Sequence, residues 1–302
     1  MSRFAIEELF PLTDGTTVDL RPQWNVDGRT IVFERRTATG SMLLRAHLRG
    51  SRLSEVEPLD LCNRDATLAQ GRAAFFGHDD FAFVSNRSGS PAVWRADLGK
   101  GLLEQLTLPF ADESDHGPTA RPDSDGHFAF FRIVGAGRPH LFVGRLGETN
   151  QPLATGRSDG DQPWFMPGAG TLVFHSVRDG DHGMFERDVD GPAPARRLAP
   201  TDEATAFVTP FPSPDGRHVV FASAATGVSQ IYVMGIDGSD RQQLTFDPEP
   251  ACFPAWAPHG DDIVFARGEP QRPAGGLFVM RLRRVSEGAQ PARTDAAAVA
   301  SQ

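Results

Sequence analysis

The chain has 302 residues, of which 39% are hydrophobic, and this is enough to bury a large core. Its net charge of -9 at pH 7 argues against a nucleic-acid partner, because binding to phosphates needs a basic face. It contains no apolar run long enough to span a bilayer, and its first residues do not resemble a signal peptide. We therefore expect a cytoplasmic protein without membrane association, in which Cys62 and Cys252 are reduced thiols.

One short pattern recurs along the chain, an apolar triplet that ends in phenylalanine. The six triplets end at Phe33, Phe83, Phe130, Phe174, Phe221 and Phe265. These marker phenylalanines follow one another at intervals of 50, 47, 44, 47 and 44 residues, which accommodates four short strands and their loops. A repeat of this length, built from short strands and glycine turns, predicts a β-propeller.

The fifth repeat shows the strand pattern of one blade most clearly. Residues 209–211 are predicted to form an inner strand, and Asp215-Gly216 lies in the turn before a second strand at 218–223. A third strand is predicted at 230–234, and a second Asp-Gly turn leads to an outer strand at 241–245. Asp-Gly between apolar runs favours a tight hairpin, because glycine adopts positive φ without steric cost. Six such units predict an all-β, six-bladed propeller of four-stranded antiparallel blades.

The two ends of the chain are expected to meet in the last blade. The sixth repeat stops after its third strand near residue 284, whereas residues 8–13 have the sequence of an outer strand. We therefore expect the amino-terminal strand to complete the last blade and close the propeller, which removes exposed strand edges. Residues 1–284 are predicted to form a single domain, and residues 285–302 a disordered tail.

The fifth repeat resembles the TolB-type repeat, also called the PD40 or WD40-like repeat. The resemblance rests on residues 213–216, 221–223, 231–234, 237–238 and 244–245, and it extends over residues 6–284. It implies six blades that serve as an interaction platform, since propellers of this family bind partner proteins or peptides across the channel mouth. The resemblance also reaches oligogalacturonate lyase, a propeller with related repeats and a metal bound by histidine.

Two chemically different faces are expected for such a propeller. Loops that lead into each blade share one face with the loops after each second strand, and we call this the mouth face. The Asp-Gly turns occupy the opposite face, which we call the hairpin face. Several polar residues are predicted on one sector of the mouth face: His116, His140, His175, His182, Asp115, Asp161, Arg132 and Arg178.

Histidine beside carboxylate can hold a divalent metal or act as a general base. We therefore select as candidate catalytic residues His116, His175, Arg132 and Asp161. The alternative is that they are polar residues of an exposed rim. No fixed ligand spacing indicates a metal, so the cofactor stays unknown, with a divalent metal as one possibility.

Arginine also recurs on the mouth face. Arg35, Arg132 and Arg267 stand two residues after a marker phenylalanine, and Arg87 and Arg178 lie in equivalent loops. A partial ring of guanidinium groups suits a carboxylate, a sulfate or an acidic peptide, because each arginine donates two parallel hydrogen bonds. We predict that the ligand-binding residues are Arg35, Arg87, Arg178 and Arg267. The alternative is pairing with carboxylates of a neighbouring blade, for which the candidates are Asp19, Glu34 and Asp65.

The sequence thus leads to two hypotheses about function. The first is a binding module whose channel mouth engages a protein, a peptide or an anionic ligand. The second is a propeller enzyme, a lyase or hydrolase of an anionic substrate that is assisted by histidine, either with or without a metal.

Overall fold

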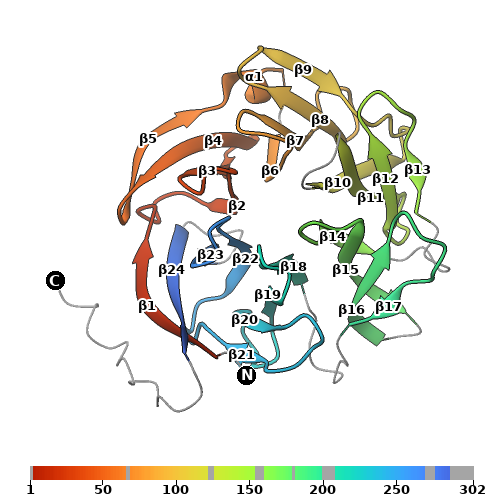
Figure 1. The fold of residues 1–302 in the computed structure, drawn as a ribbon. Helices are drawn as coiled ribbons and strands as arrows, with labels where there is room; N and C mark the ends of the chain where they lie inside the picture. Colours follow the sequence, from red (N-terminus) through yellow and green to blue (C-terminus); the bar gives the residue numbers. More distant parts are fainter. Residues whose placement is uncertain are drawn as a thin grey trace.

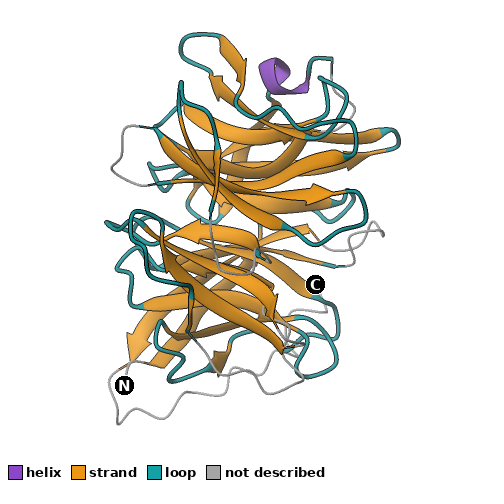
Figure 2. Ribbon diagram, turned by 90° about the vertical axis from the view of Figure 1, so that its right-hand side faces the viewer, coloured by secondary structure: helices purple, strands orange, loops and turns teal. Residues whose placement is uncertain are grey.

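The computed structural model describes residues 3–65, 69–121, 126–153, 160–178, 181–198, 208–268 and 276–285. Six four-stranded antiparallel sheets are arranged as blades around a common axis (Figure 1). Figure 2 shows the same blades from the side, with loops at both ends of the strands. The predicted all-β, six-bladed propeller is confirmed.

The first three blades follow one another along the chain. Blade one contains β2 (Asp19–Trp24), β3 (Thr30–Thr37), β4 (Gly40–Arg49) and β5 (Arg52–Pro58). Blade two contains β6 (Ala69–Phe75), β7 (Asp80–Ser85), β8 (Ala92–Asp97) and β9 (Leu102–Gln105). Blade three contains β10 (Glu113–Ala120), β11 (His127–Val134), β12 (His140–Arg145) and β13 (Gln151–Pro152).

The last three blades return the chain to its starting point. Blade four contains β14 (Asp161–Phe165), β15 (Thr171–Arg178), β16 (Asp181–Asp188) and β17 (Arg196–Arg197). Blade five contains β18 (Val208–Pro212), β19 (His218–Ser223), β20 (Gln230–Gly235) and β21 (Gln242–Gln243). Blade six contains β22 (Ala251–Trp256), β23 (Asp262–Arg267), β24 (Gly276–Val285) and β1 (Arg3–Pro11).

The amino-terminal strand closes the propeller, as predicted. β1 pairs with β24 from Arg3 opposite Val285 to Pro11 opposite Phe278. The strand starts earlier than the predicted residues 8–13 and ends at Pro11. β24 extends to Val285, the first residue assigned to the predicted tail, and residues 286–302 lie outside the described part of the chain.

The marker phenylalanines are the centre of the core. All six are completely buried, at 0% exposure, because each lies on the second strand of a blade, between two sheets. Phe33 of blade one, for example, shares a cluster with Val264 and Val279 of blade six. Burial of such a side chain stabilises the fold by roughly 1.5–3 kcal/mol. The sequence repeat is therefore the repeat of the core itself.

One element was not expected from the sequence. A single helical turn, α1 (Asp60–Asn63), follows the outer strand of blade one. The Asn63 side chain accepts from the Leu43 N–H at 2.8 Å and donates to the Leu43 carbonyl at 2.9 Å. Asn63 thus takes the place of a strand partner for β4, and the turn buries Cys62.

The first strands of the blades lie nearest the axis. β2, β6, β10, β14, β18 and β22 surround the centre in Figure 1, and each contacts the next around the propeller. Residues at equivalent positions of these inner strands therefore face a common space.

Substitution of Phe10 tests whether the pairing of β1 with β24 stabilises the propeller. Phe10 is 8% exposed and packs with Trp24 and Phe33, whereas its neighbour Leu9 is 41% exposed. We expect Phe10→Ala to lower the free energy of unfolding by about 3 kcal/mol, through loss of buried area and the cavity left behind. Leu9→Ala on the same strand is the control, with a change below about 0.5 kcal/mol. Urea denaturation measures both, and equal losses would contradict closure through a buried seam.

Candidate functional site

A structural irregularity recurs at the same place in every inner strand. The register between the first and second strands shifts in all six blades. At each shift lies a residue with positive φ, and we call these six residues the bulge ring: Arg21, Arg72, Gly117, Gln162, Thr209 and Phe253. The ring holds five of the eight non-glycine residues with positive φ in the described part of the chain. Such strain clusters at binding and catalytic sites.

Arg72 is a buried cation that connects blade two to blade four. Its Nη1 donates to Gln162 Oε1 at 2.5 Å, and its Nη2 donates to the Pro163 carbonyl. The guanidinium lies 4.3 Å from the centre of the Trp164 ring. Burial lowers the pKa of Arg72 to about 9. The groups that contact the guanidinium are neutral. The charge of Asp161 acts on Arg72, but no described carboxylate forms an ion pair with it.

Gly117 gives Arg72 its path across blade three. A Cβ atom at this position would lie 2.7 Å from Phe131 Cε1 and 3.0 Å from Arg72 Nη1. Only glycine leaves room for both groups. The absence of a side chain at this position of the bulge ring therefore allows the Arg72 side chain to extend past blade three to blade four.

Arg21 places a second cation near the axis. Its Nη1 donates to the buried Glu34 carboxylate at 2.7 Å, and its guanidinium lies 4.8 Å from the centre of the Phe253 ring. The charge of Arg21 acts on groups from three other blades, and these groups are Arg72, His116 and Cys252. Residues far apart in the chain thus converge here.

Two of the predicted catalytic residues contact each other. His175 lies opposite Asp161 in the sheet, and its Nδ1 is 2.8 Å from Asp161 Oδ1. This contact orients the imidazole as a carboxylate orients a general base. However, His175 is only 8% exposed and its Nε2 is buried, so the atom that would act as the base faces the interior.

His116 lies beside the bulge ring, and its contacts within the described part of the chain do not include that pair. Its ring packs against Phe131, with centroids 5.6 Å apart, and its Nε2 is 3.0 Å from Ser114 Oγ. Burial lowers the pKa of His116, an effect that Asp115 opposes and Arg21 reinforces. His116 is therefore a neutral imidazole at neutral pH.

Most of the predicted arginines are paired within the protein. Arg35 donates two hydrogen bonds to Asp19, at 2.7 and 2.9 Å, and Arg132 donates two to the fully buried Asp115, at 2.6 and 2.9 Å. In each pair the two residues lie opposite each other in the first and second strands of one blade. Arg35 thus pairs with Asp19, one of the carboxylates named in the alternative. In both pairs, however, the carboxylate belongs to the same blade and not to a neighbouring one, because the cross-strand residue is nearer.

The remaining predicted residues have other surroundings. Arg267 contacts Asp247 at 2.6 Å, and Arg87 donates to backbone carbonyls of Leu61 and Cys62. The side chains of Arg178 and His182 lie outside the described part of the structure. Assignment of these arginines to ligand binding stays a prediction.

The described residues contain no group of three or more histidine, cysteine, aspartate or glutamate side chains placed to hold a metal ion. Within the same residues, no helix is long and apolar enough to cross a bilayer. The sequence had not identified four polar residues of the bulge ring, Arg21, Arg72, Gln162 and Thr209. A signal was present, since proline follows the ring residue in five blades, at positions Pro22, Pro118, Pro163, Pro210 and Pro254.

The mouth face also carries exposed apolar side chains. Leu108 and Phe110, in the loop that leads into blade three, are 77% and 74% exposed. Phe246, in the loop that leads into blade six, is 74% exposed. A pocket of about 600 Å³ lies beside the first loop, lined by Ser88, Gly89, Ser90, Gln105, Leu108, Pro109 and Ala111.

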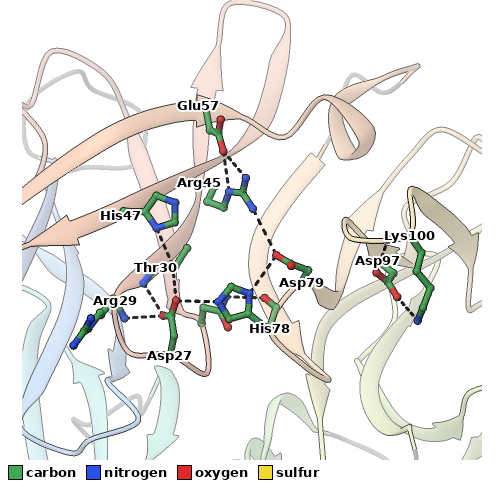
Figure 3. A network of polar contacts seen from close by, with 11 residues as sticks. Asp27, Arg29, Thr30, Arg45, His47, Glu57, His78, Asp79, Asp97 and Lys100 are labelled. Carbon is green, nitrogen blue, oxygen red and sulfur yellow. Dashed lines mark hydrogen bonds and ion pairs between the residues drawn. The ribbon is translucent and has the colours of Figure 1, made fainter.

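The hairpin face has a different character. His78 of blade two lies between Asp27 of blade one, at 3.2 Å, and Asp79, at 3.4 Å (Figure 3). Arg45 of blade one reaches Asp79 at 3.6 Å. His78 is an exposed turn residue, and the network joins two blades at their surface, where ion pairs contribute at most about 1 kcal/mol.

Two glycines of blade three can be used to test whether the Arg72 side chain passes close to Gly117. Gly117 and Gly135 have almost the same φ, 56° and 54°, but a Cβ at Gly135 would meet nothing within 4 Å. Both alanine variants carry the same backbone strain, so we expect Gly117→Ala to cost about 1–3 kcal/mol more than Gly135→Ala. Chemical denaturation measures the difference, and equal costs would show that Gly117 is not tightly enclosed.

The lowered pKa of His116 predicts acid sensitivity. The unfolded chain binds a proton near pH 6.5 that the folded protein resists, so stability is complete above this pH and falls below it. We expect the free energy of unfolding to fall between pH 7 and about pH 5. His116→Gln should make this decline shallower, as measured by denaturation at a series of pH values. An unchanged pH profile in the variant would show that His116 protonates freely.

More than half of the chain resembles proteins of one family. Residues 134–289 match the family model of the TolB beta propeller domain. Over 214 residues the chain is 30% identical to the protein TolB homolog of Chlorobium chlorochromatii, covering 70% of this chain and 45% of that protein. The matched segments span only 33% to 45% of the curated relatives.

Solved structures share the fold. TolB from Acinetobacter baumannii superposes with a TM-score of 0.63 at 19% identity, covering 79% of this chain and 57% of that one. Oligogalacturonate lyase from Vibrio parahaemolyticus superposes with a TM-score of 0.58 at 12% identity, covering 93% and 97%. The repeats, the six closed blades and the match to the family model lead to one conclusion: the chain belongs to the TolB β-propeller (PD40) family.

Proposed function

We propose that the chain is a binding module whose mouth face engages a partner protein or peptide. The observation that carries the proposal is the exposure of Leu108, Phe110 and Phe246, the three most exposed large apolar side chains among the described residues. All three lie in loops that lead into blades, and none lies on the hairpin face. Apolar side chains exposed on one face are typical of surfaces that bind other proteins.

The loop before blade three is built to present its apolar side chains. The Phe110 N–H donates to Glu113 at 2.9 Å, and the Phe110 carbonyl accepts from the Ser90 hydroxyl at 3.2 Å and from the Glu113 N–H at 3.0 Å. The backbone is thus fixed from two sides while the aromatic ring faces solvent. An anchored loop loses little conformational freedom on binding, which favours affinity.

The adjacent pocket fits a protein ligand. Its volume of about 600 Å³ accommodates one or two side chains, and its lining combines apolar groups with serine hydroxyls. A partner with an apolar side chain for the pocket would cover Leu108 and Phe110. Similarity to TolB homologues supports a protein partner. The net charge of -9 argues against a nucleic acid. The cytoplasmic location stays a prediction.

An enzyme that acts on an anionic substrate is the second candidate function. The contact between His175 and Asp161 and the nearby charge of Arg72 favour it. The buried Nε2 of His175 weighs against it, because a substrate cannot reach that atom without a movement of the blade. Asp19–Arg35 and Asp115–Arg132 are cross-strand pairs of the same kind, which supports a structural role for His175.

The binding function can be tested by capture of partners from a lysate of the source cell, followed by measurement of affinity with the partner identified. We expect Leu108→Asp with Phe110→Ser to weaken binding at least tenfold, since central apolar contacts commonly contribute more than 1.4 kcal/mol. Val26→Asp is the matched control, because Val26 is 53% exposed and lies beside the Asp27 turn of the hairpin face. Equal affinities for all three proteins would refute binding through the mouth face.

A further inference from the structure

We propose that the bulge ring binds the carboxylate group of a small ligand on the propeller axis. This site is separate from the apolar loops of the mouth face and does not need a protein partner there. It takes its donors from several inner strands, which the closed propeller brings to one level.

The first argument is that no carboxylate of the described residues contacts the Arg72 guanidinium, although the charge of Asp161 acts on it. The residue is only 6% exposed, and its three contacts are with an amide oxygen, a backbone carbonyl and an indole ring. Its Nε is buried and has no hydrogen-bond partner among the described residues. A buried guanidinium without a paired anion is costly, and an anionic ligand beside it would remove that cost.

The second argument is a further unsatisfied group in the same ring. Thr209 is 8% exposed, and its Oγ1 is buried without a hydrogen-bond partner in the described part of the chain. Gln162 accepts from Arg72 through Oε1, which leaves its amide NH₂ as a donor. Blades two, four and five thus each contribute a donor for an acceptor such as a carboxylate. Arg72 Nε and Thr209 Oγ1 are enclosed, so a ligand reaches these two atoms only with a shift of the side chains around them.

The third argument is that small molecules can reach this level. The side chains of Arg21 and Asp161 are 25% and 30% exposed although both lie on inner strands. Gln162 and Phe253 are also only partly buried. These side chains of the inner strands are therefore not sealed from solvent.

The contacts of the charged groups leave a place for an anion at Arg72. The Glu34 carboxylate is engaged by Arg21, and the Asp161 carboxylate is engaged by His175. Asp161 acts on the charge of Arg72 but does not contact it, so the guanidinium has no carboxylate within hydrogen-bond distance among the described residues. A carboxylate has the charge and the two acceptor oxygens that a guanidinium and neighbouring neutral donors satisfy together. The Phe253 ring provides an apolar surface for the carbon chain of such a ligand.

The experiment measures binding of glutarate to the full chain by isothermal titration calorimetry. The matched control is glutaramide, the neutral diamide of the same length, at equal ionic strength. We expect glutarate to bind and glutaramide not to bind. Trialanine with a free carboxyl end, compared with its amide, forms a second arm, which distinguishes a peptide terminus from a small acid as the source of the carboxylate.

Three variants locate the site. Arg72→Gln, Arg21→Gln and Thr209→Val should each weaken binding of the carboxylate, by about tenfold for Arg72→Gln, which loses a charged donor. Arg52→Gln, which removes an exposed arginine from an outer strand, should leave binding unchanged. If Arg72→Gln does not fold, the other two variants decide, because Thr209→Val keeps the shape of the side chain.

The results separate this site from the mouth face. Leu108→Asp with Phe110→Ser should leave glutarate binding intact, whatever its effect on a protein partner. Failure of both glutarate and free trialanine to bind would overturn the proposal. Equal binding of the acids and their amides, or undiminished binding in all three ring variants, would overturn it as well.

Discussion

Pairing of β1 with β24 is the constraint on which the rest of the structure depends. The strands of each blade pack mainly against those of the neighbouring blades, so the inner strands share one axis only if the first and last blades meet. The seam combines a strand ladder, the buried side chains of Phe4 and Phe10, and two hydrogen bonds between Gln242 and the backbone of Phe4. Because Gln242 belongs to blade five, the first strand is fixed to two blades at once. Closure thus defines both the core and the level at which the bulge ring forms.

The fold could be predicted because its determinants are local and repeated. Each marker phenylalanine occupies the same buried place on a second strand, so its spacing reports the size of a blade directly. The Asp-Gly turns add positive φ where the hairpins need it, as at Gly28 and Gly216. The helical turn α1 escaped notice because it depends on Asn63, which binds the backbone of Leu43 twenty residues earlier. A single side-chain contact of this kind produces no repeating pattern in the sequence.

The site could be predicted only in part, for a related reason. His175 and Asp161 were placed together correctly, since both lie where strands of blade four meet the mouth face. The prediction that arginines of the mouth face bind a ligand rests only on their positions in the repeat. Those positions do not reveal that Arg35 and Arg132 face carboxylates across the sheet. Arg72 was missed because its partners lie 90 residues away and its burial depends on Gly117. Only the tertiary structure creates these relations.

The choice of residues in the bulge ring is itself informative. Glycine would adopt positive φ at no cost, yet five of the six blades place a side chain there, at about 1 kcal/mol or more each. If the bulge served only to bend the inner strand, glycine would suffice in every blade. The side chains therefore have a role that outweighs the strain, and they differ from blade to blade: two arginines, an amide, a hydroxyl and an aromatic ring. An asymmetric set of groups on a nearly symmetric frame is what recognition of an asymmetric ligand requires, whereas a purely mechanical role would repeat one residue around the axis.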